Sequence, residues 1–163
     1  MLAGTPAIWN DEAEEAMNRG IEARRGEPWF TEAQQAIEDE QAGAFSSVDD
    51  LLENVRRQSP LYFHRWEGNE QVGREIWEFA HAEPLRQFNA EFPTLNLSAE
   101  LRAIDAPTLV VVADDDFIAG PVCAEAIVRE VPDVRLVTIR DCGHFIYAEQ
   151  PDAFRAALTD FLV

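Results

Sequence analysis

Two short stretches in the C-terminal third of the chain carry residue types that can move protons. Residues 113–117 read Ala-Asp-Asp-Asp-Phe and follow an apolar run at 108–112. Residues 141–145 read Asp-Cys-Gly-His-Phe and follow a second apolar run at 134–139. A carboxylate that orients an imidazole leaves the other ring nitrogen free to take a proton from a nucleophile. The predicted chemistry is therefore general base catalysis by a carboxylate–histidine pair.

Two strands must position these loops. The run at 108–112 is unbroken and rich in β-branched residues, which predicts a strand buried on both faces of a parallel sheet. The run at 134–139 alternates more cleanly, and Gly120-Pro121 opens a helix to about residue 130 between the two strands. Such a unit forms a right-handed crossover, so both loops leave from the carboxyl ends of strands at the same edge of the sheet.

The motifs in these stretches resemble one family. Residues 104–112 followed by the acidic loop, and residues 142–145 followed by Glu-Gln-Pro-Asp-Ala-Phe at 149–154, are similar to the C-terminal end of the α/β-hydrolase family. The resemblance implies an α/β fold class, with two or three parallel strands, flanking helices and a helical cap. It also implies a triad in the chain order nucleophile, acid, histidine.

The resemblance assigns two members of that triad. His144 matches the family's histidine, and Asp116 matches its acid, three residues after the glycine position that Ala113 occupies here. Asp115 is the alternative acid, and a solvated acidic turn is the plainer interpretation of residues 114–116. A metal site is not favoured because no histidine or further carboxylate lies at ligand spacing nearby. No cofactor is expected.

The nucleophile is missing from the sequence. The family carries it in a Gly-x-Ser-x-Gly turn, and none of the four serines stands in that pattern. We expect a hydrolase of ester, amide or peptide bonds whose nucleophile comes from a missing or separate N-terminal portion. The alternative is a catalytically inactive, truncated relative that acts as a binding or regulatory subunit. The expected partners are a small-molecule or short peptide substrate, and a complementary N-terminal hydrolase fragment or a second copy of the chain.

The composition changes near residue 98 and predicts three regions. Residues 1–9 would end a core strand and enter a cap, 10–97 would form a helical cap or lid, and 98–163 would form the core segment. Within the cap, Asn10 or Asp11 and Ser46 or Ser47 are expected helix caps, Pro28 is expected at the first position of a helix, and 68–82 reads as another helix.

The cap also supplies candidate substrate contacts. A cap of this style is similar to those of prolyl-aminopeptidase-like and small-ester hydrolases. Two loop aromatics join the aromatic residues of the cap as candidate lining of a substrate pocket: Trp9, Trp29, Phe30, Trp66, Trp77, Phe79, Phe117 and Phe145. Packing of helix on helix is the plainer interpretation for most of them. Four glutamates are candidates for an amine site by residue type alone: Glu67, Glu70, Glu75 and Glu78. His64 and His81 are expected to be surface or structural residues.

The overall charge limits the partners. The chain has 163 residues and a formal net charge of −18, and all 13 of its basic residues are arginines. Such acidity argues against nucleic acid and against an anionic membrane surface. The two cysteines form no disulfide framework, and no leader or membrane span is recognised. A cytoplasmic setting is expected.

Overall fold

The computed structural model describes residues 1–43, 45, 47–78 and 92–163. Its elements, in chain order, are β1 (Leu2–Ala3), α1 (Asp11–Glu22), α2 (Phe30–Gln41), α3 (Val48–Gln58), the 3-10 helix η1 (Ser59–Tyr62), α4 (Glu70–Glu78), the 3-10 helix η2 (Phe92–Thr94), α6 (Ser98–Arg102), β2 (Thr108–Ala113), α7 (Pro121–Glu130), β3 (Val134–Ile139), α8 (Ile146–Glu149) and α9 (Pro151–Leu162).

The strands form one parallel sheet in the order β1-β2-β3. Leu2 lies opposite Val110, and Val110 lies opposite Leu136. The parallel pairing of β2 with β3 confirms the crossover that the sequence predicts. Helices cover both faces, so the α/β fold class is confirmed as well.

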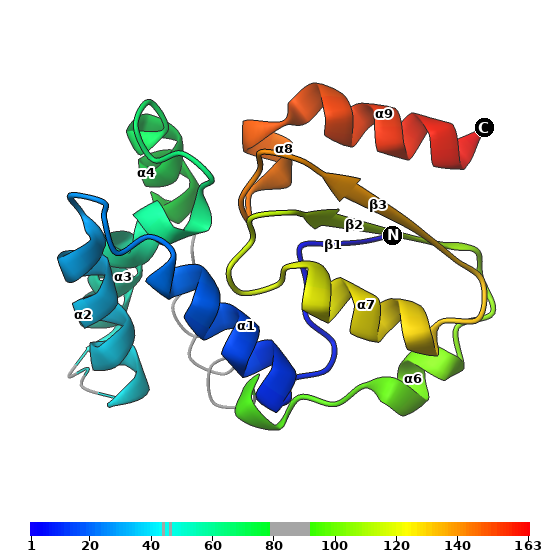
Figure 1. The fold of residues 1–163 in the computed structure, drawn as a ribbon, viewed down its shortest axis with the longest axis horizontal. Helices are drawn as coiled ribbons and strands as arrows, with labels where there is room; N and C mark the ends of the chain where they lie inside the picture. The colour runs from blue at the N-terminus through cyan, green and yellow to red at the C-terminus, as the bar shows by residue number, and fades with distance from the viewer. Residues whose placement is uncertain (44, 46, 79–91) are drawn as a thin grey trace.

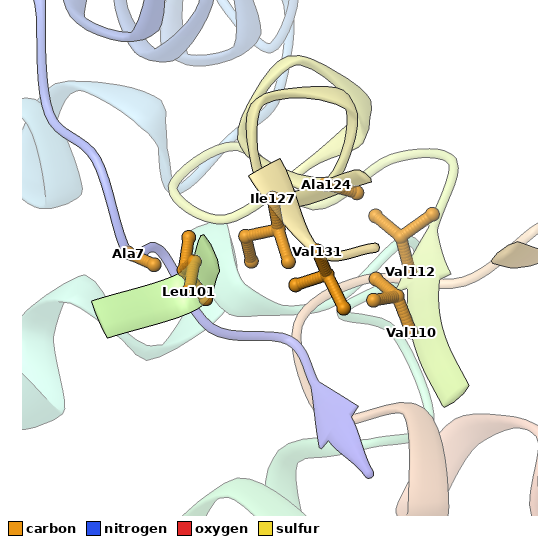
Figure 2. Close-up of a cluster of buried hydrophobic side chains, with 7 residues drawn as sticks. All are labelled: Ala7, Leu101, Val110, Val112, Ala124, Ile127 and Val131. Atoms are coloured by element: carbon orange, nitrogen blue, oxygen red, sulfur yellow. The ribbon is translucent and has the colours of Figure 1, made fainter. Parts of the chain in front are cut away.

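β2 is buried on both faces, and every one of its six residues is buried. Val110 and Val112 face α7 and pack with Ile127 and Val131 (Figure 2). The intervening residues Leu109, Val111 and Ala113 belong to a second cluster, which includes Ala157 of α9. Each fully buried valine or leucine contributes about 1.5–3 kcal/mol to stability, so β2 is the centre of the core.

The helices α1 to α4, which we call the helical segment, lie beyond the carboxyl ends of the strands (Figure 1). The Asn10 side chain accepts a hydrogen bond from the Ala13 N–H at 3.0 Å, and the Ser47 hydroxyl accepts one from Asp50 at 3.1 Å. Both residues are therefore helix caps, as predicted. The helix expected at 68–82 is present as α4, and its predicted last residues, 79–82, lie outside the described residues.

The prediction for Pro28 is wrong. α2 begins at Phe30, with Trp29 as its flanking residue. The Phe30 N–H donates to the Glu27 carbonyl at 3.1 Å, which places Pro28 at the second position of a turn. The fixed φ of proline suits that position as well as it suits a helix start.

None of the helices in the described part of the chain is long and apolar enough to cross a bilayer.

Candidate active site

The acid loop, residues 114–117, follows β2 and buries the carboxylate of Asp116. Its Oδ1 accepts hydrogen bonds from the backbone N–H groups of Ile118 and Ala119, each at 3.0 Å. The side chain has no exposed surface. A buried carboxylate needs donors on both oxygens, and these two amides satisfy one of them. The other oxygen, Oδ2, is left for His144.

Gly120 allows the acid loop to close. A Cβ at this position would lie 2.3 Å from the Asp116 carbonyl oxygen. Since that neighbour is backbone, it could not move aside without shifting the loop. The glycine before α7 therefore fixes the path of the chain around Asp116.

The histidine loop, residues 140–145, follows β3 and is tied to the acid loop. The Asp115 N–H donates to the Cys142 carbonyl at 3.1 Å, and the Cys142 N–H donates to the Asp114 carboxylate at 3.3 Å. Asp141 has a φ of 51°, a left-handed conformation that aspartate tolerates better than most residues. These contacts hold the start of the histidine loop beside the acid loop.

Asp116 and His144 meet between the two loops. The Nδ1 atom of His144 lies 2.9 Å from Oδ2 of Asp116. Because an ionised carboxylate can only accept, Nδ1 carries the proton, and Nε2 is the ring nitrogen with a free lone pair. The His144 side chain is 24% exposed, whereas that of Asp116 is fully buried. The pair can therefore accept a proton at Nε2 and stabilise the resulting imidazolium.

Two further segments enclose this pair. Gly4, just after β1, has a φ of 52°, and a Cβ there would lie 3.3 Å from the His144 carbonyl oxygen and 3.8 Å from Asp116 Oδ2. On the other side, the His144 N–H donates to the carbonyl of Tyr62 at 2.8 Å. The close approach at Gly4 was not recognised from the sequence. Its only signal there is a glycine that follows two apolar residues.

Tyr62, at the end of η1, is the central residue of an aromatic cluster beside His144. Its ring meets His144 edge-on with centroids 5.5 Å apart, meets Phe117 edge-on at 5.1 Å, and stacks on Phe145 at 5.6 Å. Burial raises the pKa of the Tyr62 phenol well above its ordinary value, and the charges of Glu40 and Asp116 raise it further. Tyr62 is therefore neutral at physiological pH. Nothing in the sequence marked this residue.

Of the aromatic residues predicted to line a pocket, the structure places some beside His144 and others elsewhere. Trp77 joins the cluster, with its ring 5.4 Å from Tyr62 and 5.8 Å from Phe145. Phe117 and Phe145 are also members. The indole Nε1 of Trp77 is buried and donates to no acceptor among the described residues.

The remaining aromatic candidates lie elsewhere. Trp66 packs on Phe63 and over Gly73 of α4. Trp29 and Phe30 belong to the core between α1, α2 and η1. Trp9 contacts Phe92 at 4.3 Å. Phe79 and His81 lie outside the described residues.

Asp115, the alternative acid, does not face His144. Its Oδ2 lies 2.9 Å from His64 Nδ1 and 3.0 Å from Arg24 Nη2. His64 is thus a partner of the acid loop, which agrees with the structural interpretation given to it. Arg24 was not singled out from the sequence, because it is one of two adjacent arginines after a helix.

A cavity of about 150 Å³ lies behind the acid loop. It is lined by residues of α1, of the acid loop and of the start of α7, with Arg24 and Asp115 at its wall. His144 is not among its lining residues. Among the described residues, no group of three histidine, cysteine or acidic side chains is arranged to hold a metal ion.

The two cysteines are poor nucleophiles. Burial raises the pKa of the Cys142 thiol to about 12, and the surrounding carboxylates, Glu149 foremost, add to the shift. Burial raises the pKa of Cys123 to about 11, with a contribution from the charge of Asp116. Since only a thiolate attacks, both are inert near neutral pH.

These features agree with the family comparison. Residues 4–157 match the model of the alpha/beta hydrolase family, and the chain belongs to this family. It is 27% identical over 117 residues to a proline iminopeptidase of Pestalotiopsis fici. It is 33% identical over 66 residues to a pimeloyl-[acyl-carrier protein] methyl ester esterase of Nitrosospira multiformis. The two matches cover 71% and 40% of this chain, but 42% and 25% of those proteins.

Solved structures show the same fold. An esterase from Thermogutta terrifontis superposes with a TM-score of 0.60 at 24% identity, over 99% of this chain and 54% of that one. An esterase from Exiguobacterium antarcticum superposes with a TM-score of 0.62 at 18% identity, over 81% of this chain and 47% of that one. The chain therefore spans about half the length of these hydrolases or less.

Proposed function

We propose that the chain supplies the acid, the general base and the lid of a hydrolase triad, and that the nucleophile lies outside these 163 residues. The observation that carries the proposal is the Asp116–His144 pair at 2.9 Å, with Nδ1 turned to the carboxylate. In this arrangement Asp116 fixes the tautomer, and Nε2 takes the proton from a hydroxyl nucleophile. The buried and fully hydrogen-bonded carboxylate favours this role over the alternative of a binding or regulatory subunit.

The nucleophile has a natural place beside β1. In the described part of the chain, β1 is hydrogen-bonded only to β2, so its other edge can accept a parallel strand. Gly4 follows β1, and a Cβ at this position would lie 3.8 Å from both Asp116 Oδ2 and His144 Cε1. A strand added at this edge would end close to His144, where a nucleophile on the following turn could reach Nε2.

The substrate class follows from the surroundings of His144. Tyr62, Trp77 and Phe145 form an apolar wall next to the imidazole. We propose that this wall contacts a non-polar group of an ester, amide or short peptide substrate. The esterase and iminopeptidase activities named for the matched relatives agree with that range.

Two buried free thiols suit a reducing compartment, and we propose the cytoplasm.

The test is a chimera. The N-terminal half of a matched esterase, including its nucleophile turn, would be joined upstream of Leu2 so that its last strand pairs with β1. We expect hydrolysis of p-nitrophenyl esters, labelling by a fluorophosphonate, and a loss of turnover of about 10³-fold or more in His144→Ala. The 163-residue chain without the added half should not be labelled.

Two results would contradict the proposal. One is a folded chimera, shown by circular dichroism and gel filtration, whose turnover is unchanged by His144→Ala. The other is stoichiometric labelling of any serine of the isolated chain.

A further inference from the structure

We infer that Arg24, Asp115 and His64 form a positioning cluster that fixes the acid loop, so that Asp116 faces His144. The inference rests on the proposed function, because it assigns a role relative to that catalytic pair. Within the described part of the chain, no hydrogen bond or ion pair joins any of the three residues to His144. Their effect would pass through the backbone of the acid loop.

Arg24 connects the end of α1 to the acid loop. Its Nη1 donates to the Gly20 carbonyl at 2.7 Å, and its Nη2 donates to the Asp115 carbonyl at 2.9 Å. The same Nη2 lies 3.0 Å from the Asp115 carboxylate, and the arginine side chain is only 9% exposed. A buried guanidinium with three acceptors at fixed positions holds both segments in one geometry.

The contact with the Asp115 carbonyl matters most. That carbonyl belongs to the peptide group that joins Asp115 to Asp116, so Arg24 fixes the peptide plane directly before the catalytic acid. The N–H of Asp115 donates to the Cys142 carbonyl in the histidine loop. The residue before Asp116 is thus held at its amide, its carbonyl and its carboxylate.

α1 packs directly on the acid loop beside Arg24. A Cβ on Gly20 would lie 2.9 Å from the Cβ of Phe117. The same helical turn whose Gly20 carbonyl accepts from Arg24 therefore contacts the residue after Asp116 as well. The acid is fixed by α1 on both of its neighbours along the chain.

His64 connects the cluster to the histidine loop. Its Nδ1 lies 2.9 Å from Asp115 Oδ2, and its Nε2 lies 4.0 Å from the Asp141 carboxylate. Its backbone N–H donates to Glu149 at 3.0 Å, and Glu149 also accepts from the Gly143 N–H at 2.7 Å. His64 therefore bridges the two loops that carry Asp116 and His144.

The geometry separates positioning from a purely electrostatic effect. Arg24 and Asp115 carry opposite charges. If charge alone matters, removing the charge of Arg24 should perturb the His144 imidazole in one direction, and removing that of Asp115 should perturb it in the other. If the cluster instead positions Asp116, both removals should weaken the same hydrogen bond. An error of about 1 Å in such a pair costs about 100-fold in rate, which is why positioning would matter in the complete enzyme.

The experiment uses the 163-residue chain with ¹⁵N-labelled histidine. The nitrogen shifts of His144 and the exchange rate of its Nδ1 proton would be measured in the wild type, in Arg24→Gln and in Asp115→Asn. We expect both variants to lose the Nδ1–H signature and to exchange that proton about tenfold faster or more. The effect should be larger in Arg24→Gln, because Asp115→Asn keeps the hydrogen bond from Arg24 to the main-chain carbonyl of residue 115. Arg24→Lys keeps the positive charge but not the two guanidinium nitrogens that donate to separate acceptors. It should therefore not show the full Nδ1–H signature of the wild type.

Matched variants complete the design. Arg102→Gln removes an exposed arginine that pairs with Glu130 at the end of α7 away from the acid loop, and His144 should be unaffected. If Arg24→Gln does not fold, His64→Gln replaces it, because the His64 side chain is 38% exposed and its loss removes one arm of the cluster. It should show the same change to a smaller degree.

The outcomes are distinct. Unchanged His144 signals in folded variants, or shifts of opposite sign in Arg24→Gln and Asp115→Asn, would overturn the positioning role and leave the proposed function intact. A wild-type chain whose His144 lacks the Nδ1–H tautomer would contradict the proposed function itself.

Discussion

The carboxylate of Asp116 meets the imidazole of His144 with only one of its oxygens. Oδ2 lies 2.9 Å from Nδ1, while Oδ1 accepts from the backbone amides of Ile118 and Ala119, which directly follow the acid loop. This division of the two oxygens fixes the rotation of the carboxylate. It also determines what an amide in its place would do.

Asp116→Asn should reverse the tautomer of His144. The two backbone N–H groups require an oxygen, so the Asn amide nitrogen must turn to Nδ1 and donate to it. Nδ1 then becomes an acceptor, the proton moves to Nε2, and the base loses its free lone pair. ¹⁵N shifts of His144 in this chain should show the reversal, and a complete enzyme should lose about 10⁴-fold in kcat, as in other triads.

Asp114→Asn is the matched control for that change. The Asp114 carboxylate accepts from the Cys142 N–H, which the oxygen of an asparagine can also do. The tautomer of His144 should therefore be unchanged. A wild-type tautomer in Asp116→Asn would show that the hydrogen bond does not determine the protonation of His144.

Gly143→Ala should separate the histidine loop from the helical segment. A Cβ at Gly143 would lie 2.5 Å from the Tyr62 carbonyl oxygen and 2.7 Å from the His64 nitrogen. Both neighbours are backbone, so no side chain can rotate away. We expect a loss of about 1–3 kcal/mol in the free energy of unfolding, as is usual for overpacking, measured by urea denaturation.

Gly26→Ala provides the comparison, because a Cβ at Gly26 would meet no atom within 4 Å. It should change the unfolding free energy little or raise it slightly, since alanine restricts the unfolded chain. Equal effects of the two substitutions would mean that the close approach at Gly143 is absent in solution.

Glu149→Gln should also loosen the histidine loop. The Glu149 carboxylate accepts from the backbone N–H groups of Gly143 and His64. A glutamine offers one oxygen where the carboxylate offers two, and its amide would face donors. We expect a loss of about 1–3 kcal/mol in unfolding free energy, whereas Glu125→Gln on the exposed side of α7 should have little effect.

The buried thiols should make the chain less stable in alkaline solution. The pKa of Cys142 is raised from 9.0 to about 12 and that of Cys123 to about 11. At a pH between the thiol pKa of the unfolded chain and these raised values, the folded state binds more protons than the unfolded state. The free energy of unfolding therefore falls as the pH rises. The contribution is fully present below about pH 9, close to the ordinary pKa of a thiol. It is lost as the pH rises toward 11 and 12.

The measurement compares the urea midpoint at pH 7.5 with the midpoint at pH 10. Cys142→Ala should show a smaller fall between the two, because it removes the thiol with the larger shift. Rapid alkylation of Cys142 by iodoacetamide in the folded chain at pH 8 would contradict its raised pKa.

Several local features were predictable because they depend on neighbours in the sequence. The unbroken apolar run at 108–112 required burial on both faces, and β2 is buried between α7 and α9. Asn10 and Ser47 cap the helices that follow them. A parallel crossover then placed the loops of Asp116 and His144 at the same edge of the sheet.

Tertiary structure alone decided which residues surround that pair. Tyr62 meets His144 across 82 positions of the chain, and Arg24 meets Asp115 across 91. Neither residue has a sequence motif, because its contact depends on where a helical segment packs and not on its own neighbours. Trp9 and Trp77 look alike as apolar residues in the sequence, yet only Trp77 joins the cluster beside His144. The two later strands and their parallel crossover follow from local hydrophobic patterns, whereas the selection among similar side chains is made by long-range packing.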